Sequence, residues 1–192
     1  MQSKIQKRKS KTAARFYPAS LDLRGQPVLV VGGGAVAARK VAALLGAQAR
    51  VTVVAPEYDA AFKTFGLAAR ARLKLVKRPF RVSDLLGQRL AFAATGDLAL
   101  NARLAAAAKR RGIWVNVAAP GEAGDFQVAA ALWRGPLCVA VSTGGASAAL
   151  ARTLRERLEQ AVGPEWGQLA TLLEARRARI LAQVAEPGAR HR

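Results

Sequence analysis

A short, continuously apolar run leads directly into three glycines and then into a helix-forming segment. Residues 27–31 read PVLVV, Gly32-Gly33-Gly34 follow, and residues 35–45 are rich in alanine and leucine before Gly46. A strand in which every residue is apolar is typical of a parallel sheet covered on both faces, and a glycine after the last helical residue is a common helix end. The sequence therefore predicts a strand, a tight turn and a helix in immediate succession.

The three glycines also match the G-x-G-x-x-A pattern of dinucleotide-binding βα units. In that pattern Gly32 permits the tight turn, Gly34 lets the backbone approach a pyrophosphate, and Ala37 allows the helix to pack closely on the sheet. The phosphates would lie at the helix N-terminus, where backbone N–H groups favour anions. The alternative is a glycine-rich turn that binds nothing. We favour dinucleotide binding because the motif lies between a predicted strand and a predicted helix.

Apolar strands and helix-forming segments alternate through the first 117 residues. We expect strands at residues 27–31, 50–55, 73–77, 90–94 and 113–117, and helical segments at residues 35–45, 58–70, 83–86 and 98–111. Five strands alternating with helices predict an α/β fold with a Rossmann-like, doubly wound parallel sheet.

The pattern changes after residue 117. Residues 126–133 and 137–142 read as a strand pair, and helices follow from residue 148, with a break near Gly163-Pro164. We expect a disordered basic arm at residues 1–15, an NAD-binding domain at 16–117, a dimerisation segment at 118–147 and a C-terminal helical domain at 148–192. Because an isolated two-stranded hairpin is marginally stable, the strand pair is expected to associate with a second copy of the chain.

Two further strand ends carry polar residues that a dinucleotide could meet. The second strand ends at Pro56-Glu57, and Glu57 is placed to bind ribose hydroxyl groups, which favours NAD over NADP. The fourth strand leads into Thr95-Gly96-Asp97, and ligands of open α/β sheets bind beyond the carboxyl ends of the strands. Thr95 and Asp97 are therefore candidates for the nicotinamide side of the crevice. Asp97 could equally cap the helix that follows it.

The formal net charge of +19 indicates an anionic partner. Six of the basic residues lie in the first fifteen positions, which contain no acid, and the remainder of the chain is basic as well. The anion could be a nucleic acid, an acidic membrane surface, or a carboxylate or phosphate ligand. The alternative is a general arginine bias with a solubilising tail. We expect nucleic acid to bind only nonspecifically, because the chain lacks the interleaved aromatic residues of a base-stacking surface.

Cysteine and histidine are nearly absent from the chain. The single cysteine is Cys138 and the single histidine is His191, so neither a disulfide framework nor a metal site built from His and Cys is expected. No apolar run reaches the roughly 20 residues of a membrane-spanning helix, and the basic N-terminus leads into no apolar segment. We expect a cytoplasmic protein that does not insert into a membrane.

Two strings of residues, at their separation in this chain, resemble a known family. Residues 32–40 read GGGAVAARK and residues 141–147 read VSTGGAS, and Thr95-Gly96-Asp97, Asn101 and Asn116-Val117 lie between them. In these features the chain resembles the precorrin-2 dehydrogenase family, the dehydrogenase–ferrochelatase module of siroheme synthase. The similarity extends from about residue 17 to about residue 173.

This resemblance implies NAD-dependent oxidation of precorrin-2 to sirohydrochlorin, with insertion of ferrous iron in some members. It implies a homodimer whose interface lies after the Rossmann-like domain. The residues that would touch the dinucleotide are Ala35, Val36, Pro56 and Glu57. Those that would border the tetrapyrrole are Asn116, Thr143, Gly144 and Ser147. A strongly basic chain suits this substrate, because the tetrapyrrole is a polycarboxylate.

The chain departs from the family at one position. Many members carry an aspartate, proposed as the general base and a participant in metal insertion, three residues after the counterpart of Asn116; here that residue is Ala119. Asp125 could replace it if the loop folds into the crevice, and Asp97 is the other candidate. Alternatively, water could remove the proton, because hydride loss leaves an acidic C–H group. A general base contributes about 10²–10⁴-fold, so we favour a retained dehydrogenase over a tetrapyrrole carrier that lacks efficient turnover. The case for iron insertion is weaker, because few metal-accepting side chains lie nearby.

Overall fold

The computed structural model describes residues 16–119 and 123–183. The chain divides into two compact units, Met1–Phe126 and Gln127–Arg192. The division lies beyond the residue 117 at which the first domain is expected to end, and the finer division into four parts stays a prediction. The predicted basic arm at residues 1–15 lies outside the described residues.

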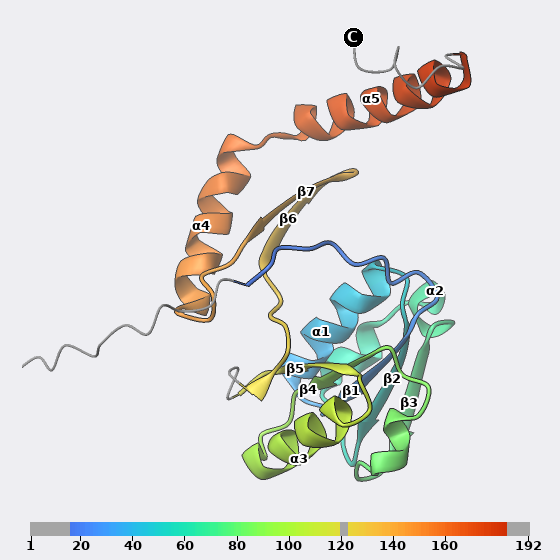
Figure 1. Ribbon diagram of the computed structural model, residues 1–192, viewed down its shortest axis with the longest axis vertical. Coiled ribbons are helices and arrows are strands. Elements are labelled where there is room, and N and C mark those ends of the chain that lie inside the picture. Colours follow the sequence, from blue (N-terminus) through green and yellow to red (C-terminus); the bar gives the residue numbers. More distant parts are fainter. Residues whose placement is uncertain (1–15, 120–122, 184–192) are drawn as a thin grey trace, which may run out of the picture. The chain divides into compact units, whose positions relative to one another are not determined.

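The first unit contains a five-stranded parallel sheet with the strand order β3-β2-β1-β4-β5 (Figure 1). The strands are β1 (Pro27–Val31), β2 (Arg50–Ala55), β3 (Leu73–Lys77), β4 (Leu90–Ala93) and β5 (Trp114–Val117). Because all five strands are parallel, their carboxyl ends lie at one edge of the sheet. The first and fourth strands are neighbours there, and the order of the strands reverses between them. The Rossmann-like fold predicted from the sequence is confirmed.

Helices cover both faces of this sheet. One face packs against α1 (Ala35–Gly46), with the 3₁₀ turn η1 (Ala60–Thr64) and the short helix α2 (Leu67–Arg70) nearby. The other face packs against α3 (Leu98–Lys109) and the 3₁₀ turn η2 (Val82–Leu85). Successive residues of a strand point to opposite faces, so Val28 and Val30 join the α1 side while Leu29 and Val31 join the α3 side. A sheet buried on both faces accounts for the uninterrupted apolar strands.

The prediction of a single helix at residues 58–70 is wrong, because the structure has the 3₁₀ turn η1 and the short helix α2 there. Asp59 caps η1 by accepting a hydrogen bond from the Ala61 backbone N–H, and the chain becomes extended at Phe65 before Gly66 begins α2. Gly66 has a low helix propensity, and in η1 only Phe62 is buried. The segment therefore lacks the continuous apolar stripe that holds a longer helix on a sheet.

The second unit consists of a hairpin and two helices. Strands β6 (Ala130–Arg134) and β7 (Leu137–Val141) pair antiparallel, and α4 (Ala148–Ala161) packs against both of them. Helix α5 (Pro164–Gln183) begins at the predicted break. The first strand of the pair begins at residue 130, later than the expected residue 126. None of the helices in the described ranges is long and apolar enough to cross a membrane.

Candidate functional site

The turn between β1 and α1 requires glycine at its first position. The φ angle of Gly32 is +125°, and its backbone N–H donates to the Val54 carbonyl over 3.1 Å. A Cβ atom added to Gly32 would lie 2.3 Å from the carbonyl oxygen of Ala94. The tight turn expected at Gly32 is therefore present, and it brings β1, β2 and the end of β4 together at the carboxyl edge of the sheet.

Gly33 allows the loop after β2 to pack closely on the glycine turn, a role that the G-x-G pattern does not predict. A Cβ atom on this residue would lie 1.9 Å from the Glu57 carbonyl oxygen. The Asp59 backbone N–H donates to the Gly33 carbonyl over 2.7 Å. The loop after β2 thus rests directly on the glycine turn, which holds the carboxylate-bearing residue Glu57 next to the start of α1. The only sequence signal of this contact was a glycine in the middle of the three, at the unspecified position of the G-x-G pattern.

The N-terminus of α1 opens onto free space. Gly34 is its N-cap, with no atom of the described residues within 4 Å of where a Cβ would lie. No side chain in the described part of the chain caps this helix, and its first turn carries no acid. Ala35 and Val36 are exposed, whereas Ala37 is buried. The arrangement offers uncapped backbone N–H groups to an anion, which fits the pyrophosphate of a dinucleotide.

Thr95 and Asp97 lie at the carboxyl end of β4. The Thr95 hydroxyl donates to Asn101 Oδ1 over 2.7 Å, and the Asp97 carbonyl lies 3.0 Å from the same hydroxyl as an alternative acceptor. The Asp97 carboxylate accepts from the Leu100 backbone N–H over 3.0 Å and caps α3. The capping expected of Asp97 is therefore present. Its carboxylate is at the same time exposed at the edge of the sheet where ligands of this fold bind.

The buried side chain of Asn101 holds the loops at this edge of the sheet in place, a role that was not predicted from the sequence. Its side chain is fully buried, at 0% exposure. Its Oδ1 accepts from Thr95, and its Nδ2 donates to the carbonyls of Thr95 and Ala119 at 3.1 and 3.2 Å. One amide therefore ties the loop after β4 to the loop after β5. The signal in the sequence was a lone polar residue on the otherwise apolar face of a helix.

Replacing Asn101 with alanine is expected to lower the free energy of unfolding by about 2–3 kcal/mol, because the buried polar groups it serves lose their partners. Urea unfolding followed by circular dichroism measures the change. Arg103→Ala, on the exposed side of the same helix, is the matched control and should stay within about 0.5 kcal/mol of the wild type. An equal loss in both variants would contradict the role given to Asn101.

Asn116 is engaged on the α1 side of the sheet. Its side chain is nearly buried; its Oδ1 accepts from Lys40 Nζ over 2.7 Å, and its Nδ2 donates to the Phe126 carbonyl over 3.0 Å. The Lys40 ammonium also lies 5.4 Å from the centre of the Phe92 ring. Burial of Lys40, with a smaller contribution from the positive charge of Arg39, lowers its pKa. Binding of a substrate by Asn116 stays a prediction.

The lowered pKa of Lys40 makes stability depend on pH. The folded protein holds this proton less tightly than the unfolded chain, so the free energy of unfolding should rise with pH between the lowered pKa and the ordinary value of 10.5. In Lys40→Met this contribution disappears, whereas Lys77→Met, at the exposed end of β3, keeps it. Urea unfolding at neutral and alkaline pH measures the difference. The same pH dependence in wild type and Lys40→Met would refute the assignment.

Asp125 lies alongside β5 rather than beyond its end. Its backbone N–H donates to the Val115 carbonyl over 2.7 Å, and its Oδ2 accepts from the Val115 N–H over 3.0 Å. Its Oδ1 lies 3.4 Å from Lys109 Nζ. Both carboxylate oxygens are thus engaged, and no described hydrogen bond joins Asp125 to Thr95 or Asp97. A catalytic role for Asp125 stays a prediction.

Thr143, Gly144 and Ser147 form a turn in the second unit. The Thr143 hydroxyl donates to the Ser147 carbonyl over 3.0 Å and accepts from the Ser147 N–H over 3.1 Å. Gly144 has a φ angle of +62°, and Ser147 caps α4 by accepting from the Leu150 N–H over 3.1 Å. These contacts fix the shape of the turn. Whether it borders a tetrapyrrole stays a prediction.

Comparison with known proteins identifies the family. A family model described as putative NAD(P)-binding matches residues 19–130, and one described as the central part of a sirohaem biosynthesis protein matches residues 134–161. The solved structure of SirC, a precorrin-2 dehydrogenase, superposes with a TM-score of 0.75 at 31% identity, over 92% of this chain and 86% of that one. The chain belongs to the precorrin-2 dehydrogenase family. The family resemblance found in the sequence is confirmed, as is the expectation of a nicotinamide dinucleotide fold.

Longer relatives of the precorrin-2 dehydrogenase family share the same region. The siroheme synthase of Methylococcus capsulatus is 45% identical over 175 residues, which are 91% of this chain and 36% of that protein. The siroheme synthase of Chromobacterium violaceum is 42% identical over 177 residues, which are 92% of this chain and 37% of that protein. The chain thus spans less than two fifths of the length of these curated relatives.

Proposed function

We propose that this chain oxidises precorrin-2 to sirohydrochlorin with NAD as the hydride acceptor, in siroheme biosynthesis in the cytoplasm. The observation that carries the proposal is the likeness to SirC over nine tenths of the chain. The open N-terminus of α1 supports it, because a dinucleotide needs such a site in this fold. NAD-dependent formation of sirohydrochlorin under anaerobic conditions tests it.

Residues of the first unit bind three parts of the dinucleotide: the pyrophosphate, the ribose and the nicotinamide. The N–H groups at the start of α1 bind the pyrophosphate, and the missing side chain of Gly34 lets the backbone come close. The exposed carboxylate of Glu57 accepts hydrogen bonds from the ribose hydroxyls and repels an additional phosphate, so NAD is bound in preference to NADP. Thr95 lines the crevice on the nicotinamide side. Bound NAD supplies the acceptor for the hydride that leaves the substrate.

We assign the proton that leaves the tetrapyrrole to Asp97. Its carboxylate is exposed at the carboxyl edge of the sheet, whereas both oxygens of Asp125 are bonded to β5 and Lys109. Ala119, at the position of the family aspartate, cannot accept a proton. This alanine favours the second candidate function, which is a tetrapyrrole carrier without efficient turnover. In the described part of the chain no three His, Cys, Asp or Glu side chains gather, so we do not assign iron insertion to it.

We also propose that the second unit forms a homodimer. On one face of the hairpin the exposed Trp133 pairs across the strands with Cys138, and Ala131 pairs with Ala140. Trp133 is 63% exposed, although large aromatic residues at strand positions normally pack. A two-stranded sheet gains stability by burying such a face. A second copy of the chain, presenting the same face, would cover it.

Trp133→Gln is expected to weaken this dimer, because truncating a central aromatic residue of an interface commonly costs at least about 2 kcal/mol, or roughly thirtyfold in dissociation constant. Sedimentation equilibrium over a range of concentrations measures the change. Trp114→Gln is the matched control, since Trp114 is 56% exposed but lies on β5 of the first unit. A wild-type chain that stays monomeric at high concentration, or an equal effect of both variants, would contradict the proposal.

A further inference from the structure

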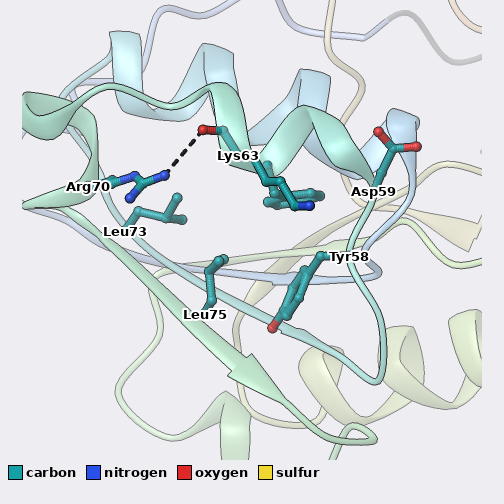
Figure 2. Close-up of a pocket in the computed structure, with 7 residues that line it drawn as sticks. Tyr58, Asp59, Lys63, Arg70, Leu73 and Leu75 are labelled. Carbon is teal, nitrogen blue, oxygen red and sulfur yellow. Dashed lines mark hydrogen bonds between the residues drawn. The ribbon is translucent and has the colours of Figure 1, made fainter.

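A cavity lies on the first unit, beside the loop that follows β2. It encloses about 470 Å³ between β3 and the segment formed by η1 and α2. Figure 2 shows Leu73 and Leu75 on the strand, Tyr58 beside them, and Lys63 and Arg70 on the opposite side. Cavities of about 300–1,000 Å³ are typical of sites for small molecules.

The cavity lies beside the break in the helix expected at residues 58–70. A continuous helix would cover β3, but the chain extends at Phe65 and restarts at Gly66. Leu75 consequently stays 44% exposed in the middle of a strand. Phe62 and Tyr58, whose rings lie 5.2 Å apart, provide an aromatic wall beside it. The cavity therefore offers an apolar, partly aromatic lining to an occupant.

The rim of the cavity is cationic. The Lys63 ammonium has no hydrogen-bond or ion-pair partner among the described residues. Arg70 uses Nε and Nη2 on the carbonyls of Phe65 and Lys63, at 2.9 and 3.2 Å, and no described carboxylate neutralises it. Residues 60–81 carry seven basic residues and no acidic one. Asp59, the acid in the lining, accepts from the Ala61 N–H at 2.8 Å.

We propose that this cavity is a second ligand site, for a small molecule with a flat apolar body and one anionic group. The apolar body lies against Tyr58, Leu73 and Leu75, and the anionic group pairs with Lys63 and with the guanidinium N–H groups of Arg70 that the backbone does not use. Both halves are needed, since an exposed ion pair alone contributes little to affinity. The loop that carries Tyr58 also rests on Gly33, so the site adjoins the glycine turn without including it.

The probe for this site is 2-naphthoate, with the uncharged 2-naphthamide as the matched ligand. Titration of the full chain without any dinucleotide, followed by amide chemical shifts, should move the signals of Phe62, Lys63 and Leu75. We expect 2-naphthoate to bind about three- to fivefold more tightly than 2-naphthamide, with the advantage shrinking as salt is added. Because neither NAD nor precorrin-2 is present, failure of this proposal is distinguishable from failure of the proposed enzyme activity.

The variant Lys63→Gln distinguishes binding at this cavity from nonspecific attraction of an anion to a basic protein. This exposed side chain makes no described bond, so the variant should fold as the wild type does. It should remove most of the preference for 2-naphthoate, whereas Lys77→Gln, at an exposed lysine of β3 outside the lining, should keep it. No shift at the lining residues at millimolar probe, or an equal effect of the two variants, would overturn the proposal.

Discussion

Gly32→Ala is expected to destabilise the protein by at least ~3 kcal/mol. The backbone of this residue has a φ angle of +125°, which side-chain-bearing residues rarely adopt, and the new methyl would lie 2.3 Å from a backbone oxygen of Ala94. Neither β1 nor the loop after β4 can move away without disturbing the sheet. Thermal and urea unfolding measure the loss, which should be accompanied by loss of NAD binding.

Gly34→Ala is the matched variant, because it adds the same methyl group two residues later. No described atom lies within 4 Å of that methyl, and the backbone of the N-cap is extended. Stability should stay within about 1 kcal/mol of the wild type, while NAD affinity, measured by calorimetry, should fall by about tenfold or more, since the methyl occupies the approach to the helix N-terminus. Unchanged NAD affinity in Gly34→Ala would show that the dinucleotide binds elsewhere.

Asp97→Asn is expected to lower kcat for precorrin-2 oxidation by about 10²-fold or more, which is the usual contribution of a general base. Asparagine caps a helix as well as aspartate does, so the bond to the Leu100 N–H and the fold should persist. The loss should therefore appear in kcat, with the KM for precorrin-2 and the Kd for NAD little changed. Anaerobic steady-state kinetics measures all three quantities.

Two further variants decide whether Asp97 itself takes the proton. Asp125→Asn keeps an oxygen for the Val115 N–H and should leave kcat within about threefold of the wild type, if Asp125 is structural. Ala119→Asp in the Asp97→Asn background restores a carboxylate at the family position and should recover part of the rate. A large loss in Asp125→Asn together with a small loss in Asp97→Asn would reverse the assignment.

The sheet and its first turn could be predicted because their signals are local. The run at residues 27–31 is apolar at every position, and a glycine turn followed by a helix has few structural solutions. The same local signals placed the other four parallel strands to within one residue at each end. The burial of both faces then follows from the continuously apolar strands of a parallel sheet, whereas the strand order was not predicted.

Contacts between distant segments could not be predicted. Whether residues 58–70 form one helix depends on how much apolar surface of β3 such a helix could bury. Helix propensity does not report this, and the segment is broken into η1 and α2. The approach of Gly33 to Glu57 joins two loops, and the bonds of Asn101 to Thr95 and Ala119 join helix α3 to the loops after β4 and β5. From the sequence, Lys40 was noted only as part of the string GGGAVAARK. Its hydrogen bond to Asn116 could not be predicted, because the two residues are 76 positions apart. These contacts set the shape of the candidate site, so the roles of individual site residues are where sequence reasoning was weakest.

Anaerobic turnover of freshly generated precorrin-2 by the wild-type chain is the most direct test of the proposed dehydrogenase activity. Formation of sirohydrochlorin is followed by its absorbance with NAD, with NADP, and without a dinucleotide, and Gly34→Ala serves as a folded variant of reduced NAD affinity. We expect product formation that depends on NAD, less product with NADP, and a raised KM for NAD in the variant. Tight binding of precorrin-2 and NAD with no product from the wild-type chain would contradict it and indicate a carrier.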